Sequence, residues 1–307
     1  MLQLTDGTPE GPGDQRSPGP RARFTFAVAT LLASAAATAA LLVSGDAARR
    51  PDPSRATGVP PVFALYEHDL PGQRRIAVAN DRLVTECMAR AGLAYESATA
   101  RAGGELAEPD PQQPFGPESI EQLAPVTEPA PPQEVARNDD YLHALYGPPD
   151  RRVAVRGARL RVSGPAHGCV AEAAARLLGA DRPRWMLLKV LLFEAAEDAR
   201  HDVESDEELR AATRRWRACM GAAGFRAEDP VELFDGLSAT GDLREVPELR
   251  ADVRCKRETG YLEVAYARLA LAQQRRLDAD PSVAADWLRL VNHQKNVANE
   301  VLAADRR

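Results

Sequence analysis

The sequence predicts an all-α protein, a disulfide-stapled helical bundle with an internal duplication, preceded by a single N-terminal transmembrane helix. Three observations lead to this fold class. An uncharged apolar run occupies Phe24–Val43, most of the chain after residue 75 spaces its apolar residues at three and four, and a motif around one cysteine recurs around another. Spacings of three and four place side chains on one face of a helix, so they favour helices over strands.

The run Phe24–Val43 contains twenty residues without a charge. As a helix it would be about 30 Å long, which is enough to cross a bilayer. Three arginines precede the run and two follow it, so the positive-inside rule favours a cytoplasmic N-terminus by one residue. The predicted protein is therefore single-pass in the cell membrane with its C-terminal domain outside the cytoplasm. The alternative is a signal segment cleaved near Ala47, which would release a secreted protein.

The remaining chain divides by composition. Residues 1–23 are rich in Gly, Pro and charge, and we expect a disordered tail there, followed after the span by a linker at 44–75. A first helical unit is predicted at 76–204 and a second at 205–307. The first unit contains an acidic insertion at 97–137, in which eight prolines fall between Pro109 and Pro132. Proline at that density excludes helices and core strands, so we expect a disordered loop.

The second unit shows the clearest helical pattern. Ser205 and Glu208 are spaced as a capping box, in which each side chain accepts the other residue's backbone N–H. Gly224 is placed to end this helix, and Asp229-Pro230 and Val246-Pro247 are typical helix starts. Between the cap and the glycine, apolar residues recur at spacings of three and four, namely Leu209, Ala212, Trp216, Cys219 and Ala223.

Two long helices are expected at the end of the chain. The first has an apolar stripe from Leu262 to Ala272, and the second begins at Asp280-Pro281. Because only a few residues separate them, we expect an antiparallel helical hairpin. Upstream, Trp185–Phe193 is apolar almost all round and is predicted to be the most buried helix of the bundle.

An internal repeat is the most informative feature of the sequence. Residues 87–96 align without gaps on residues 219–228, and five of the ten positions are identical. Both copies begin with Cys-Met and have glycine five positions after the cysteine. The repeat predicts two related units, each with a cysteine in the last turn of a helix that a glycine ends.

The same repeat predicts the disulfide pairing. Each copy is followed by a lone cysteine with glutamate three residues later, so we expect the bonds Cys87–Cys169 and Cys219–Cys255. An even number of cysteines behind an export segment is typical of disulfides. Four cysteines permit three connectivities, which the sequence alone leaves open, and buried free thiols are the alternative.

The pattern Trp216-x-x-Cys219-Met220-x-x-x-Gly224-Phe225, followed by Asp252-x-x-Cys255 and two long helices, resembles uncharacterised exported or membrane-anchored proteins of actinobacteria. The resemblance covers residues 205–303 and implies export and a helical fold. That family has no established activity, so the resemblance implies no catalytic or binding residues.

Two groups of residues are candidates for chemistry. Glu194, Asp198 and His201 fall on one face of a helix and are a candidate divalent-metal site, although a di-metal site of the helical-bundle type needs a second such helix. A solvated charged turn is the alternative. Glu67-His68-Asp69 is a candidate acid–base group, with plain surface polarity as its alternative. No motif for a catalytic nucleophile, a phosphate loop or a cofactor occurs, and we expect no cofactor.

The predicted function is therefore a non-enzymatic protein-interaction or cell-envelope accessory module. Its partners would be the membrane, through Phe24–Val43, and another envelope protein. A net charge of -6 does not favour nucleic acid as a ligand. The candidate partner surface is a stripe on the last helix, formed by Trp287, Leu290, Val297 and Val301. The alternative function is an exported hydrolase with its site near Glu67–Asp69 or Glu194–His201.

Overall fold

The computed structural model describes residues 3–4, 59–95, 113–123, 138–237 and 243–304. These residues are mostly helical, with a small sheet. The helices in chain order are α1 (Pro61–Glu67), α2 (Leu70–Arg90), η3 (Glu121–Leu123), α4 (Asp139–Tyr146), α5 (Cys169–Leu178), η4 (Gly179–Asp181), α6 (Arg182–Glu204), α7 (Glu207–Ala222), α8 (Pro230–Gly236), η5 (Leu243–Glu245), α9 (Pro247–Glu258), α10 (Tyr261–Ala279) and α11 (Pro281–Ala303). The strands are β1 (Gln3–Leu4), β2 (Arg152–Arg156) and β3 (Arg161–Pro165).

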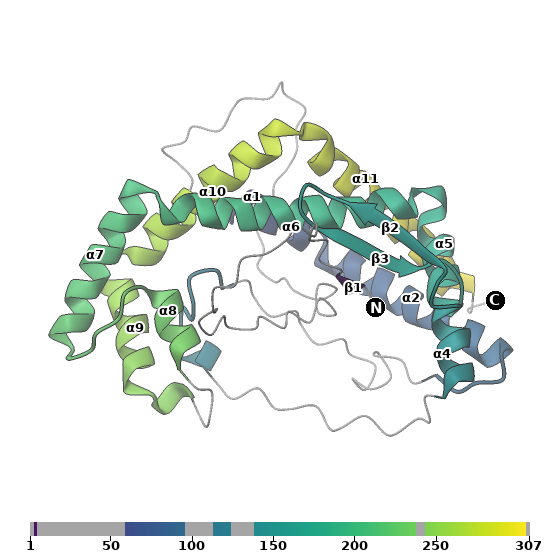
Figure 1. Cartoon of the computed structure of the whole chain (residues 1–307), viewed down its shortest axis with the longest axis horizontal. Coiled ribbons are helices and arrows are strands. Elements are labelled where there is room, and N and C mark those ends of the chain that lie inside the picture. Colours follow the sequence, from purple (N-terminus) through teal and green to yellow (C-terminus); the bar gives the residue numbers. More distant parts are fainter. Residues whose placement is uncertain (1–2, 5–58, 96–112, 124–137, 238–242, 305–307) are drawn as a thin grey trace, which may run out of the picture.

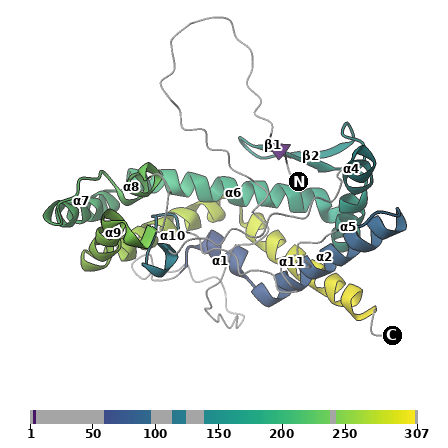
Figure 2. The ribbon, with the colours of Figure 1, turned by 90° about the horizontal axis from the view of Figure 1, so that it is seen from below.

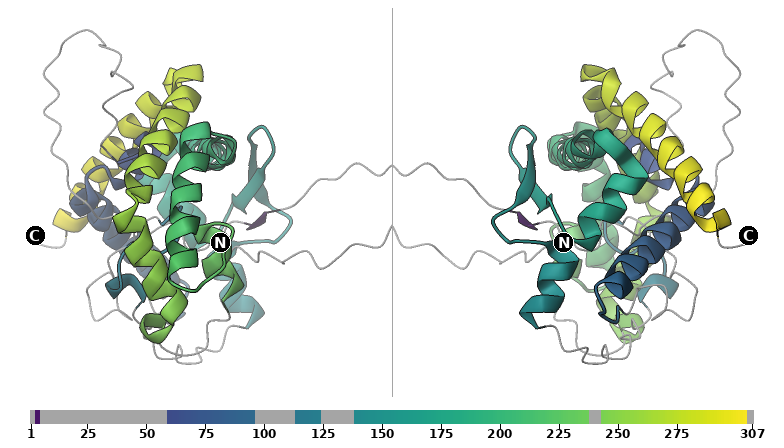
Figure 3. Two further views of the ribbon diagram at one scale, coloured as in Figure 1. Left: turned by 90° about the vertical axis from the view of Figure 1, so that its left-hand side faces the viewer. Right: turned by 90° about the vertical axis from the view of Figure 1, so that its right-hand side faces the viewer.

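Helix α6 is the central element of the fold. It runs along the longest axis, with α7, α8 and α9 at one end and α4 and α5 at the other (Figures 1 and 2). The sheet covers one side of α6, and α10, α11 and α1 pack on the other, with α2 packed against α11 and α5 (Figure 3). Leu188 and Leu192 are fully buried, so the buried helix predicted at Trp185–Phe193 is part of α6.

The small sheet corrects the prediction of an all-α fold. Its strand order is β1-β3-β2, and β2 and β3 are antiparallel with Val155 opposite Val162. In Arg-Val-Ala-Val-Arg the two valines lie two positions apart, so they share one face of the strand, while Arg152, Ala154 and Arg156 share the other. Strand β1 lies within the tail expected to be disordered and pairs Gln3 with Ser163.

Helices α10 and α11 do not form the predicted antiparallel hairpin. They diverge at Asp280, which alone separates them (Figure 1). Antiparallel helices need a connecting loop of about 2–5 residues, so a single residue is too short for the chain to fold back. Instead, α10 packs mainly on α6 and α7, whereas α11 packs mainly on α2, α5 and α6.

The helix starts follow the sequence closely, with one exception. Asp229, Val246 and Asp280 precede helices that open with proline, as predicted. The cap of α7 is Asp206 rather than Ser205, because the Asp206 carboxylate accepts from the backbone N–H groups of Glu208 and Leu209. The Ser205 hydroxyl donates to the Asp202 carbonyl instead.

Two segments predicted as linker or loop are ordered. The linker predicted at 44–75 contains α1 and the start of α2, and Val62 in α1 is fully buried. Within the insertion predicted to be disordered at 97–137, residues 113–123 are docked on the core, with Phe115 and Leu123 buried. Apolar side chains anchor both segments against the loss of chain entropy.

The predicted membrane span at 24–43 lies outside the described residues, as do 5–23, 44–58, 96–112 and 124–137. Among the helices that the structure describes, none combines the length and apolar character that a bilayer crossing requires.

Candidate functional site

The most elaborate site holds residues 113–123 against α8, α9 and α10. We call this segment the docked peptide. The side chains that receive it, or support those that do, are called the cradle and are Trp216, Asp252, Lys256, Tyr261 and Tyr266. Figure 1 shows the short helix of the docked peptide, η3, beside α8 and α9 and far from α2 and α4, the neighbouring helices in the chain.

An aromatic ring fixes the docked peptide in the cradle. Phe115 is 4 % exposed and belongs to the main core cluster. Its ring meets the rings of Tyr261 and Tyr266 edge-on, with centroids 6.2 and 5.4 Å apart. Edge-to-face contacts at these distances add about 0.5–1.5 kcal/mol each to the burial of the ring. Phe115 is therefore the apolar anchor of the docked peptide.

A buried charge pair recognises the peptide backbone. Lys256 Nζ donates to the Pro117 carbonyl at 2.8 Å and to Asp252 Oδ2 at 2.7 Å. The indole N–H of Trp216 donates to Asp252 Oδ1 at 3.0 Å. Neither side chain of the charge pair is exposed, and burial raises the pKa of Asp252 and lowers that of Lys256 while their contact opposes both shifts. Hydrogen bonds satisfy both carboxylate oxygens, as a buried carboxylate requires.

The docked peptide also uses a carboxylate and a glycine. The Tyr266 hydroxyl donates to the Glu118 carboxylate, and burial together with this contact raises the pKa of Tyr266. Gly116 has a φ of +73°, and an added Cβ would lie 3.3 Å from both Lys256 Nζ and the Pro230 carbonyl oxygen. A side chain at position 116 would be strained and crowded, so the cradle is specific for glycine there.

The charged groups of the cradle are turned toward the docked peptide and toward each other. Asp252 and Lys256 are closed off from solvent and engaged with each other, with Trp216 and with the docked peptide. A catalytic acid or base must reach a substrate atom within hydrogen-bond distance. The arrangement instead holds a turn of the chain, in which the Gly116 N–H donates to the Gln113 carbonyl. The turn is held through one aromatic ring, one backbone carbonyl and one carboxylate.

Both predicted disulfides are confirmed. Cys87 pairs with Cys169 and Cys219 with Cys255, at Cα–Cα distances of 5.4 and 5.7 Å. The ends of α2 and α7, which follow Cys87 and Cys219, share one hydrogen-bond pattern. The N–H of Leu93 donates to the Met88 carbonyl, and that of Phe225 donates to the Met220 carbonyl. The glycine before each apolar residue has positive φ, as a helix C-terminus of this type requires.

The surroundings of the disulfides do not favour redox chemistry. Carboxylates of Glu172 and Glu258 lie 3.4 and 3.6 Å from Cys87 Sγ and Cys219 Sγ. A negative charge beside a sulfur opposes formation of a thiolate, and a poor leaving thiolate slows exchange. An open cavity of about 420 Å³ adjoins the Cys87–Cys169 disulfide, and its other walls are formed mostly by alanines and His167. Both bonds are therefore structural staples.

The candidate metal ligands are directed to different partners. Glu194 accepts from the backbone N–H groups of Ala158, Arg159 and Leu160 at 2.7–2.9 Å and so anchors the β2–β3 turn on α6. Asp198 pairs with Arg159, and His201 Nδ1 lies 3.1 Å from the Glu204 carboxylate. No group of three potential ligands that could hold a metal occurs in the described ranges.

The candidate acid–base group is also dispersed. Asp69 caps α2 through Gly72 and pairs with Lys295 Nζ at 2.7 Å, and the contact with Lys295 lowers its pKa. Burial raises the pKa of Glu67. The backbone carbonyl of His68 accepts from Gln73. These contacts position the turn between α1 and α2 and converge on no common point.

The predicted partner stripe on α11 belongs to the core. Trp287, Leu290 and Val301 are buried, and Val297 packs against the cluster around Ala298. The Trp287 ring stacks on the Trp185 ring with centroids 4.4 Å apart, and the Trp287 indole N–H donates to the Leu65 carbonyl. An apolar helical stripe has the same pattern whether a partner or the protein's own core covers it.

Sequence reasoning missed the cradle because its parts are distant in the chain. The one available signal was Phe115-Gly116-Pro117 within the acidic, proline-rich stretch, since an aromatic residue is unusual in a solvated loop.

Comparisons with known proteins bring no further assignment. No protein-family model matches the chain, and neither a curated protein nor a solved structure gives a significant match.

Proposed function

We propose that this chain is a non-enzymatic protein-interaction module of the cell envelope, and that its α7–α10 region recognises a Pro-Phe-Gly-Pro-Glu peptide in a turn conformation. The observation that carries the proposal is the docked peptide itself. Its contacts with Tyr261, Tyr266 and Lys256 fix a ring, a carboxylate and a backbone carbonyl. A partner that presents the same segment would be bound through the same contacts, in competition with residues 113–123.

The extracytoplasmic location is part of the proposal. Two disulfides are compatible with it, because such bonds persist in oxidising compartments. The resemblance of residues 205–303 to exported proteins and the uncharged run Phe24–Val43 add support. Either a single-pass anchor or a secreted form cleaved near Ala47 fits these observations, and the proposed partner is another envelope protein rather than nucleic acid.

The anchor has a consequence for the sheet. A single span at 24–43 would place Gln3–Leu4 and the helical domain on opposite sides of the membrane. The β1–β3 pairing therefore belongs to a molecule whose residues 24–43 are not inserted. In an inserted molecule the outer edge of β3 would lack this strand.

The internal duplication is also proposed, on the shared turn geometry. In both copies the apolar residue after the glycine donates its N–H to the methionine carbonyl, and a glutamate lies beside the first sulfur. The setting of the second cysteine differs, since Cys169 begins α5 whereas Cys255 lies in the last turn of α9. The duplication would thus cover the turns, with different elements added around them.

The alternative function is an exported hydrolase. No observation on the described residues favours it.

Peptide binding in trans tests the proposed function. The full chain with Phe115→Ala and Glu118→Gln should have an emptied cradle, and a fluorescent peptide of residues 113–123 should then bind, as measured by anisotropy. A peptide with Phe115→Ala should bind about 10- to 100-fold more weakly, because burial of a phenylalanine ring is worth about 1.5–3 kcal/mol. Tyr266→Phe, added to the emptied chain, should weaken binding of the unchanged peptide.

The folded state of the emptied chain is the control, checked by helical circular dichroism and by both disulfides in a non-reducing peptide map. An emptied chain that passes these checks and binds neither peptide would refute the proposed recognition.

A further inference from the structure

The β2–β3 hairpin carries an unusual concentration of positive charge. Residues 151–171 include five arginines and one histidine and no aspartate or glutamate. The chain as a whole has a net charge of -6. A basic segment of this length in an acidic protein indicates a local surface with its own electrostatic character.

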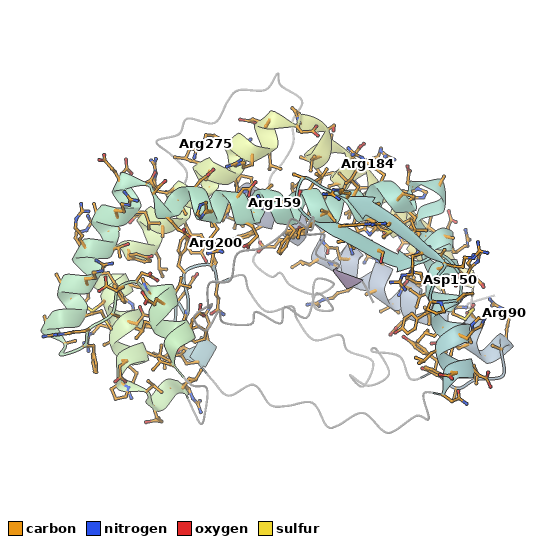
Figure 4. The ribbon with its side chains drawn as sticks, in the orientation of Figure 1. Arg90, Asp150, Arg159, Arg184, Arg200 and Arg275 are labelled. Atoms are coloured by element: carbon orange, nitrogen blue, oxygen red, sulfur yellow. A yellow bond between two sulfur atoms is a disulfide. The ribbon has the colours of Figure 1, made fainter. Side chains whose placement is uncertain are left out.

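Two of these arginines directly face each other across the sheet. Arg156 and Arg161 are registered partners of β2 and β3, and both are exposed. Like charges at directly opposed positions destabilise a sheet. No carboxylate in the described part of the chain pairs with either of them. The nearby acids are engaged elsewhere, Glu194 with the backbone of the turn and Asp198 with Arg159, which Figure 4 shows beside α6.

The other end of the hairpin is basic as well. Arg152 donates to the Ser163 carbonyl at 3.2 Å, and Arg182 donates to the Pro165 carbonyl. Both guanidinium groups are thus bound to backbone oxygens rather than to carboxylates. Burial and the positive charge of Arg152 lower the pKa of Arg182, so the two cations are close enough to repel each other.

Small side chains separate the two basic ends on the outer face. Ala154 and Ser163 are registered partners and share the face of Arg152 and Arg156, because side chains alternate along a strand. At about 3.3 Å per residue, the α-carbons of Arg152 and Arg156 are ~13 Å apart. This face turns away from the helices (Figure 3). It is a flat, low surface with guanidinium groups at both ends.

We propose that the outer face of β2 and β3 binds a polyphosphate chain, a linear polymer in which every unit is a charged phosphate. Guanidinium groups bind phosphate oxygens in pairs of parallel hydrogen bonds, and a phosphate between Arg156 and Arg161 would relieve their repulsion. Because Arg152 and Arg156 lie ~13 Å apart along the strand, their guanidinium groups can contact separate phosphates of one chain. A membrane surface fits less well, since Val59 and Leu142 are the exposed large apolar side chains of the described part and lie outside the hairpin.

Binding to polyphosphate tests this inference, which does not depend on the cradle. The full chain is titrated with a labelled polyphosphate at 50 and 200 mM salt, and the double variant Arg156→Gln/Arg161→Gln is compared with Arg214→Gln/Arg215→Gln. The control pair is also exposed and removes the same charge from α7, which lies at one end of the molecule, away from the sheet. The hairpin variant should bind at least tenfold more weakly, and its slope of log affinity against log salt should fall by about 2.

Three results would overturn the inference. Equal loss in the hairpin and control variants would show that only total charge matters. Tighter binding to vesicles of anionic phospholipid than to polyphosphate would assign the face to a membrane. Tighter binding to polyglutamate would assign it to an acidic protein. Orthophosphate should compete only weakly, because it occupies one arginine pair at a time.

Discussion

Replacement of Lys256 by methionine is the sharpest test of how the cradle is held together. Methionine has a similar length and no charge, so it fills the space without a cavity. It leaves the Asp252 carboxylate, whose side chain is fully buried, with a hydrogen bond from the Trp216 indole, and it leaves the Pro117 carbonyl without its donor. Removal of one partner of a buried ion pair costs about 3–5 kcal/mol. We expect a loss of stability in that range, measured by urea unfolding.

The loss should depend on pH in a defined direction. Burial raises the pKa of Asp252, and Lys256 is the main opposing influence, so the pKa rises further in Lys256→Met. A carboxyl group whose pKa is higher in the folded than in the unfolded chain favours the folded state below its unfolded pKa of about 3.9. That contribution disappears as pH rises through the folded pKa. The deficit of the variant should therefore be small near pH 4 and should grow as the pH rises.

Lys295→Met is the matched control. Lys295 pairs with Asp69 at the same 2.7 Å distance, but both side chains are about a quarter exposed. Solvent screens such a pair, which is worth about 0–1 kcal/mol. If Lys256→Met cost no more than Lys295→Met at pH 7, or if its deficit grew on acidification, the buried pair would not hold the cradle as argued.

Two further predictions concern the staples and the hairpin. Cys219→Ser/Cys255→Ser opens a bond with a sequence separation of 36 and should lower stability by at most ~4 kcal/mol in urea unfolding, whereas unchanged stability would contradict a staple role. Glu194→Gln replaces one acceptor oxygen with an amide that cannot accept, so amide hydrogen exchange at residues 158–160 should accelerate before that of α6, at a cost of ~1–3 kcal/mol. Uniform exchange along both elements would argue against the anchor.

Local features of this fold follow from the sequence. Helix starts at Asp229-Pro230 and Asp280-Pro281 are correct because capping and proline geometry involve only neighbouring residues. The cap of α7 was displaced by one position, from Ser205 to Asp206, since both residues can accept hydrogen bonds at a helix start. The disulfide pairing was also predictable, because the two Cys-Met turns place Cys87 and Cys219 in equivalent local geometry.

The errors occur where a segment's environment outweighs its composition. Residues 113–123 lie in a proline-rich acidic stretch, yet Phe115 fills a space among rings that the chain contributes more than 140 positions later. The hairpin at 152–165 was missed because its valines needed the face of α6 to bury them. In both cases the compensating contact is invisible in any short window of sequence.

By itself, the sequence indicated the starts of α8, α9 and α11, the expected pairing of the cysteines and the apolar stripes. Hydrogen bonds and side-chain spacing along a helix involve residues no more than a few positions apart. Only the tertiary structure decided what each stripe faces. It buried Trp287 in the core rather than on a partner surface, directed Glu194 to a turn rather than to a metal, and joined Lys256 to Pro117. Such pairings depend on chain segments that meet only after folding, and the free energy of a buried polar group depends on which partner it meets.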